Sequence, residues 1–222
     1  MTAKILRTGV LCALPGELGS LGDRIRDRRR CQGLDLLYLD LPGAEIVACV
    51  GGVGKVAAAQ AASLLVGEGL DQLLVVGTCG ALRRGMAIGS LLHCKCTIQA
   101  DLAVREGREI EAHQLLTKAW QKVAPGPEGW LVTADRPVLS PWRRLRLARA
   151  FLGPCAADME TAAAAWVAQR AGVPWAALRV VTDHAGPSTP RSFAQNFPRL
   201  AGVPADSVPA LLMVPESGRR TQ

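Results

Sequence analysis

Apolar residues along this chain fall into short continuous runs, and amphipathic stretches with a helical repeat separate the runs. A run of four to eight apolar residues between turn signals is typical of a buried strand, whereas apolar spacings of three and four predict a helix. The predicted strands are residues 9–14, 34–41, 44–50, 73–77, 89–99, 130–133 and 175–181. The predicted helices are residues 54–67, 111–123, 141–151 and 160–171.

Strands that alternate with helices predict an α/β fold, and we expect a three-layer α/β/α sandwich with a mixed central sheet. The chain has 222 residues, 49% of them apolar, which is ample for one hydrophobic core. No internal repeat or linker interrupts it, so we expect residues 1–222 to form a single domain. Three prolines, Pro204, Pro209 and Pro215, predict that any helix in the C-terminal tail is short.

The charge pattern does not indicate a nucleic-acid partner. The net charge is +7, but the arginines concentrate in segments 24–30 and 143–149, where no aromatic residues are interleaved. Helix faces or loops would leave them solvated. No apolar run reaches the ~18 residues needed to span a membrane, and the weak signal-like start runs directly into Pro15. We therefore expect a cytoplasmic protein without a membrane span.

Cysteine usage favours reduced, buried thiols. The seven cysteines are an odd number, lie mostly in apolar segments and lack the C-x-x-C spacing. Cys94 and Cys96 would face the same side of a strand, but a zinc site needs two further ligands and only His93 is near. We expect no metal.

Acidic residues lie at the end of two predicted strands and at the start of one predicted helix. Asp183 ends the strand 175–181, Glu160 opens the helix 160–171, and Glu17 lies just after the first strand. Because ligands bind at the carboxyl ends of strands in α/β sheets, these carboxylates are the best candidates for chemistry. A lone Glu at such a place is commonly only a helix-terminal charge, so its meaning depends on its neighbours.

Two glycine motifs also follow predicted strands. The first, Gly51-Gly52-Val53-Gly54-Lys55, lacks the residues of a Walker loop, and no acidic residue ends the next strand as a dinucleotide site requires. Either a ligand-binding turn or a plain strand–helix turn fits it. The second motif, Gly77-Thr78-Cys79-Gly80, provides small residues such as Gly80 that let backbone approach a flat ligand.

Five motifs in order resemble one enzyme superfamily, which contains the purine nucleoside phosphorylases and the methylthioadenosine/S-adenosylhomocysteine nucleosidases. The resemblance extends to about Phe197 and implies a pocket in which the bond between a base and ribose is broken. The motifs are Ala13-x-x-x-Glu17, Gly51-x-x-Gly54-Lys55, Gly77-Thr78-x-Gly80-Ala81, Met159-Glu160 and Arg179-x-x-Thr182-Asp183.

The resemblance implies a role for each matching residue. Asp183 would protonate the purine N7, and Glu160 would bind the ribose hydroxyls. Met159 would pack under the sugar. Glu17 would orient or deprotonate the attacking water, and Thr78 would lie near the nucleophile.

Further substrate contacts follow from the same resemblance. Phe193 matches a pocket aromatic of the nucleosidases. The stretch from Thr133 to Val138 is similar to the segment that flanks the base, but Pro137 stands where those enzymes have a stacking aromatic residue.

The acceptor is expected to be water. Val75 stands where hexameric phosphorylases of the family have a phosphate-binding arginine, and no Gly-Asp-Pro-x-Arg loop follows the first strand. Two alternatives stay open. One is phosphorolysis with inorganic phosphate, including cleavage of adenosylhopane by hopanoid-associated members, and the other is a non-catalytic nucleoside-binding relative.

The resemblance also bears on cofactors and assembly. It implies a nucleoside substrate with adenine as the base, and no metal or organic cofactor. We expect a homo-oligomer, because family members complete their pockets with a neighbouring subunit, and segment 100–108 is the expected contact.

Overall fold

The computed structural model describes residues 5–104 and 108–214 of the chain. Its strands are β1 Arg7–Cys12, β2 Ile25–Cys31, β3 Leu34–Leu41, β4 Ala44–Val50, β5 Gln72–Ala81, β6 Leu91–Gln99, β7 Glu109–Glu111, β8 Glu128–Thr133, β9 Cys155–Asp158 and β10 Trp175–Asp183. Its helices are a 3-10 helix η1 Pro15–Arg24, α1 Lys55–Val66, α2 Gln114–Val123, α3 Pro141–Ala150, α4 Thr161–Arg170, α5 Thr189–Leu200, α6 Val203–Asp206 and α7 Val208–Leu212.

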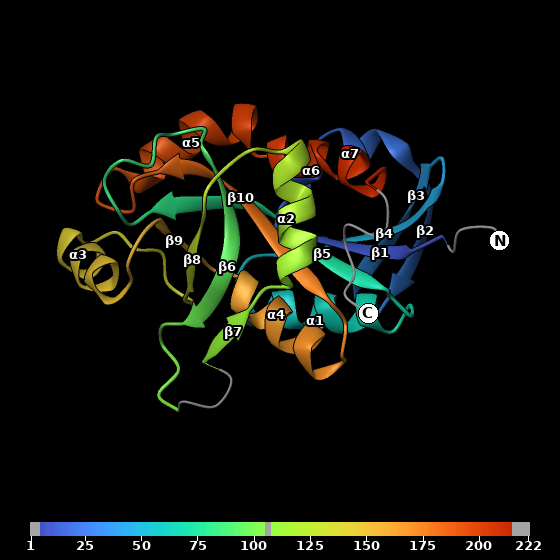
Figure 1. The fold of residues 1–222 in the computed structure, drawn as a ribbon, viewed down its shortest axis with the longest axis horizontal. Coiled ribbons are helices and arrows are strands. Elements are labelled where there is room, and N and C mark those ends of the chain that lie inside the picture. The colour runs from blue at the N-terminus through green and yellow to red at the C-terminus, as the bar shows by residue number, and fades with distance from the viewer. Residues whose placement is uncertain (1–4, 105–107, 215–222) are drawn as a thin grey trace.

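All of these strands belong to one mixed sheet, and helices cover both of its faces (Figure 1). The order is β10-β6-β8-β9-β5-β1-β4-β3-β2, with β7 added to β6. Because β5 pairs with β10 as well as with β9, five strands close into a small barrel. The remaining strands, β1 to β4, extend it as an open sheet. The predicted three-layer sandwich with a mixed sheet is confirmed.

Parallel pairing brings the carboxyl ends of several strands to one edge. β1 is parallel to both β4 and β5, and β5 is parallel to β10. The loops that leave these strands therefore meet over the same edge, which is where ligands bind in such sheets.

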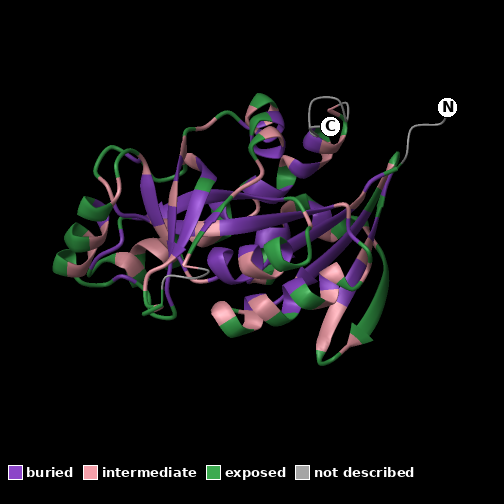
Figure 2. Ribbon diagram, turned by 60° about the horizontal axis from the view of Figure 1, so that its bottom comes forward, coloured by how far each residue is buried: buried purple, intermediate pink, exposed green. Residues whose placement is uncertain are grey.

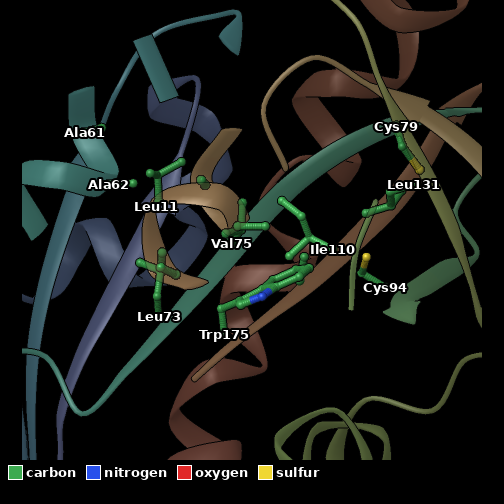
Figure 3. Packing of buried hydrophobic residues seen from close by; sticks show 14 of the residues in the cluster. Leu11, Ala61, Ala62, Leu73, Val75, Cys79, Cys94, Ile110, Leu131 and Trp175 are labelled. Carbon is green, nitrogen blue, oxygen red and sulfur yellow. The ribbon is translucent and has the colours of Figure 1, made fainter. Parts of the chain in front are cut away.

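Two of the three hydrophobic clusters in the described residues pack the helical layers on the sheet, and the third lies beneath α3. On one face, the small residues of α1 and α4 pack closely on the sheet, and Ala61 and Ala62 lie near Leu11 (Figure 3). On the other face, α2, α6 and α7 cover the sheet around Trp120. Burial of both faces of the central strands is evident in Figure 2. No helix in the described part of the chain is long and apolar enough to cross a membrane.

Some sequence predictions need correction. Segment 24–30 was expected in helix faces or loops, but four of its five arginines lie on the edge strand β2, which is largely exposed, and Arg24 ends η1. Charged side chains on an edge strand discourage pairing with other chains. The sequence analysis also missed β7, β9 and α5. The expectation of short helices in the tail is confirmed by α6 and α7, of four and five residues.

Trp120 is the anchor of the second core, and its replacement gives a direct test of that packing. The side chain is fully buried, and its indole N–H donates to Ser207 Oγ at 2.7 Å, which ties α2 to the C-terminal helices. Trp120→Ala is expected to lower the free energy of unfolding by about 3–5 kcal/mol. Urea denaturation followed by circular dichroism measures it. The matched control is Trp142→Ala, because Trp142 is 81% exposed and should change stability by less than about 0.5 kcal/mol.

Candidate active site

The largest concentration of buried carboxylates lies in a pocket at the carboxyl ends of β1, β5, β8, β9 and β10. The pocket has a volume of about 160 Å³, and its walls are mainly apolar. The residues that the sequence analysis singled out are all among its lining: Glu17, Thr78, Gly80, Pro137, Val138, Met159, Glu160, Asp183 and Phe193.

Asp183 ends β10 and is buried, with unequal surroundings for its two oxygens. Oδ1 accepts hydrogen bonds from the Ala185 N–H at 2.9 Å and the Thr189 hydroxyl at 2.7 Å. Oδ2 lies 3.1 Å from the Thr182 hydroxyl, which also lies 3.3 Å from the Cys79 carbonyl oxygen. The single hydroxyl proton can serve only one of these two acceptors. Oδ2 therefore has fewer hydrogen-bond donors than Oδ1.

Glu17 is held in one orientation by four hydrogen bonds. Oε2 accepts from the N–H groups of Ala13 and Leu14, at 2.9 and 3.0 Å. Oε1 accepts from the N–H and the hydroxyl of Thr78, at 2.9 and 3.0 Å. These donors come from the ends of β1 and β5, so the carboxylate bridges two strands at the floor of the pocket.

Glu160 lies at the start of α4 and faces the turn that opens α1. Its Oε1 accepts a hydrogen bond from the Gly54 N–H at 3.0 Å, which gives the first glycine motif a specific partner. Burial raises the pKa of Glu160 to about 7, although the Arg179 guanidinium and the Gly54 N–H act in the opposite direction. The carboxylates of Asp158 and Glu17 add to the upward shift.

Arg179 is the buried cation beneath these carboxylates. It lies in the middle of β10, only 1% exposed, and its Nη2 is 2.8 Å from Asp158 Oδ2 and 3.8 Å from Glu160 Oε2. Asp158 in turn accepts hydrogen bonds from the hydroxyls of Thr133 and Thr161. The nearby carboxylates raise the pKa of Arg179 against the effect of its burial. The guanidinium therefore stays charged.

Gly77 leaves room for this arrangement. A Cβ at this position would lie 2.3 Å from Arg179 Nη1 and 2.7 Å from Glu17 Oε1. Its φ of 146° also lies in the region that favours glycine. Glu17 and Arg179 thus approach each other across the backbone of β5.

Helix α5 covers one side of the pocket. The ring of Phe193 lines the pocket and lies 4.9 Å from the ring of Phe197, which contacts the backbone at Gly16. The Thr189 hydroxyl joins the start of α5 to Asp183, and the Asn196 amide donates to the Thr182 carbonyl oxygen at 2.9 Å. The opposite side is formed by aliphatic residues, and Pro137 there is exposed.

Arg179 is part of one of the sequence motifs, but no role was predicted for it or for Asp158. A signal was available, because an arginine inside the apolar strand 175–181 requires a buried anionic partner. Thr133 and Thr189 carried no such signal. Segment 100–108, expected to reach a neighbouring subunit, lies partly outside the described residues.

Comparisons with known proteins agree with this geometry. The family model described as "Phosphorylase superfamily" matches residues 7–212. The 5'-methylthioadenosine/S-adenosylhomocysteine nucleosidase of Shewanella baltica is 26% identical over 208 residues, which cover 85% of this chain and 88% of that protein.

Two solved structures have a similar fold. The S-adenosylhomocysteine nucleosidase of Streptococcus pyogenes, in complex with 5-methylthiotubericidin, has a TM-score of 0.89 at 22% identity, covering 97% of this chain and 100% of its own. A futalosine hydrolase mutant of Helicobacter pylori has a TM-score of 0.87 at 21% identity, covering 94% and 99%.

The raised pKa of Glu160 predicts a stability effect with a definite sign. The folded protein binds a proton on the Glu160 carboxylate more tightly than the unfolded chain does. The contribution of this group to the free energy of unfolding is therefore present below pH 4.5 and is lost as the pH rises through about 7. Glu160→Gln should therefore raise the melting temperature at pH 8, and the difference from wild type should shrink toward pH 5. Differential scanning calorimetry across this range measures it.

The control for this experiment is Glu45→Gln, since Glu45 forms an exposed ion pair with Arg7. Such pairs contribute little, so its melting temperature should change little at either pH. A Glu160→Gln protein that is less stable than wild type at pH 8 would contradict the prediction.

Proposed function

Because the chain belongs to the phosphorylase superfamily, we propose that it hydrolyses the N-glycosidic bond of a purine nucleoside, with adenine as the base. The observation that supports this best is the convergence of Asp183, Glu160 and Glu17 on one pocket from three different strand ends. The similar Shewanella protein is a nucleosidase by name, which supports hydrolysis and an adenine nucleoside.

Asp183 acts as the general acid in this proposal. The proton on Oδ2 passes to N7 of the purine while the bond between N9 and C1′ breaks and its electron pair moves into the base. Oδ1 is occupied by the Ala185 and Thr189 donors, which fixes the direction in which Oδ2 points. Proton transfer at the leaving group removes the charge that would otherwise develop on the base.

The other two carboxylates act on the sugar and on water. Ionised Glu160 binds the ribose hydroxyls and stabilises the positive charge that develops at the ribosyl carbon. The oxygen of a water molecule forms the new bond to C1′. One proton of that water stays on the new hydroxyl group, and Glu17 accepts the other. The products are the free base and the ribose bearing whatever group stands at its 5′ position.

The charges of the pocket support water rather than phosphate as the acceptor. Four carboxylates, Glu17, Asp158, Glu160 and Asp183, line the pocket, and the only cation in its described lining is the exposed Arg136. Arg179 is already neutralised by Asp158 and Glu160. Val75 is fully buried in the core. An anionic phosphate would therefore meet net repulsion.

Catalysis is favoured over simple nucleoside binding by the burial of these groups. Each buried carboxylate costs free energy, and a binding site for a neutral nucleoside has no need of several. The proposed hydrolysis uses water and needs no metal or organic cofactor.

Assembly and location complete the proposal. We propose a symmetric homo-oligomer, because the exposed Pro137 leaves the base side of the pocket open and a neighbouring subunit could cover it. We also propose that the enzyme works in the cytoplasm, where the seven free thiols would stay reduced.

Asp183→Asn tests the general acid. Asparagine keeps the shape but cannot donate the proton, so kcat for adenine release should fall by about 10²–10⁴-fold. The release of adenine from 5′-methylthioadenosine, followed by its absorbance change, measures this rate. The control is Asp206→Asn, a surface aspartate that accepts a hydrogen bond from the Ser20 N–H and should leave kcat unchanged. Near wild-type turnover in Asp183→Asn would remove Asp183 from the mechanism.

The acceptor can be identified from the products. In phosphate-free buffer, adenine release should proceed at full rate and yield a reducing sugar. Addition of inorganic phosphate should leave both the rate and the product unchanged, as mass spectrometry of the sugar will report. Product that forms only with phosphate, as a ribose 1-phosphate, would replace hydrolysis with the phosphorolytic alternative.

A further inference from the structure

Helix α3 and its flanks form a surface that the proposed reaction does not use. The helix lies at one end of the molecule, away from the main helical layers, in both views (Figures 1 and 2). We name the stretch 139–152 the α3 face. Of the eleven large apolar side chains left exposed in the described residues, four lie on it: Leu139, Trp142, Leu145 and Leu152.

Two of these apolar side chains are almost fully in contact with solvent. Trp142 is 81% exposed and Leu152 is 88% exposed. Neither side chain belongs to a core cluster of the described residues, so most of the surface of each stays in contact with water. The face therefore carries apolar groups that are available to another surface.

The same stretch is strongly basic. It contains Arg143, Arg144, Arg146 and Arg149 and not a single acidic residue. Beside it, a surface hollow between α3 and the segment after β5 is lined by two more arginines, Arg83 and Arg84, and among the described residues by no carboxylate. Six arginines at one end of a chain of net charge +7 make an anionic partner the complementary one.

We propose that the α3 face docks on an anionic phospholipid surface. Interfacial helices combine arginines with tryptophan and leucine side chains that enter the boundary between headgroups and acyl chains, which is the composition seen here. The cytoplasmic leaflet carries a negative potential that attracts such clusters. Nucleic acid would use the arginines but would leave Leu139, Leu145 and Leu152 exposed to water.

Docking at this face would place the pocket next to the lipid. Leu147 of α3 lines the pocket, while its neighbour Ala148 lines the outer hollow, so the helix is a wall shared by both. Arg144 also donates to the carbonyl oxygen of His184, the residue that follows Asp183. The proposal concerns binding alone and does not depend on which nucleoside is cleaved.

Vesicle co-sedimentation tests the proposal with the full chain. The wild type should pellet with vesicles of phosphatidylcholine mixed with phosphatidylglycerol, and should stay in solution with phosphatidylcholine alone. Arg146→Gln with Arg149→Gln should weaken binding about thirtyfold, because each arginine near an anionic surface contributes roughly a factor of five. The matched control is Arg26→Gln with Arg28→Gln on β2, the same charge change at the opposite end of the molecule (Figure 1), which should weaken binding far less.

Trp142 provides a second, spectroscopic readout. On anionic vesicles the tryptophan emission should shift to shorter wavelength, and Trp142→Phe should abolish the shift. Of the other four tryptophans, Trp120 and Trp175 are buried, and Trp130 and Trp166 are partly buried against the core clusters. An unchanged shift in this variant would overturn the proposal. So would an equal loss of binding in the two arginine pairs, or failure to pellet with anionic vesicles.

Two further outcomes assign the face to another partner. If Trp142→Ala dissociates an oligomer in sedimentation velocity without lipid, the face belongs to a second copy of the chain. If duplex DNA binds in place of vesicles and the Arg146/Arg149 variant loses it, the partner is nucleic acid. Either result overturns lipid docking.

Discussion

The ion pair between Arg179 and Asp158 is the interaction on which the rest of the site depends. The pocket collects carboxylates from several strand ends, and without a central cation their mutual repulsion would oppose folding. Arg179 supplies that cation from β10 while its Nη1 donates to the Val76 carbonyl oxygen of β5, at 3.2 Å. The guanidinium thus joins the two long strands that close the barrel. Glu160 lies farther from it, so only part of that carboxylate's burial is compensated, which is why its pKa stays high.

Barrel closure explains why the site residues come from such distant parts of the sequence. Asp183 and Gly80 are paired in the register of β10 and β5, although about a hundred residues separate them. Ala157 pairs with Gly80 from the other side, so the strand that leads to Glu160 also arrives at this point. A few backbone pairings at the end of β5 therefore bring Asp183 and the strand that leads to Glu160 to the same point.

Much of this organisation could be predicted from the sequence, because it rests on local patterns. Strands such as β3 and β4 were bounded correctly, since continuous apolar runs mark buried strands. β2 could not be recognised, because its paired residues are nearly all charged and its strand state comes from hydrogen bonds to β3. Likewise α5 contains Pro198 in its interior, which argues against a continuous helix when only propensity is considered.

The candidate site could be predicted only in part from the sequence. The carboxylates at strand ends could be named from their positions, and all of them line the pocket. Their hydrogen-bond partners could not be named, because contacts such as that of Thr189 with Asp183 arise only when the turn after β10 is formed. Ala185 in that turn has a φ of 42°, a left-handed backbone conformation that no pattern in the sequence predicted. Residue propensities predict helices and strands, whereas tertiary contacts determine the orientation of a side chain.

The attachment of α5 to β10 has a mechanical consequence. The helix that covers the pocket is tied by the Thr189 hydroxyl to the acid itself and by the Asn196 amide to the backbone just before it. Any outward swing of α5 that begins at Thr189 must break the hydrogen bond that orients Asp183. In the proposed mechanism the cover of the pocket and the proton donor are therefore coupled, because the Thr189 hydroxyl orients Asp183 only when α5 lies where it does here. If Asp183 is the general acid, protonation of the leaving base would be restricted to the arrangement in which α5 covers the pocket.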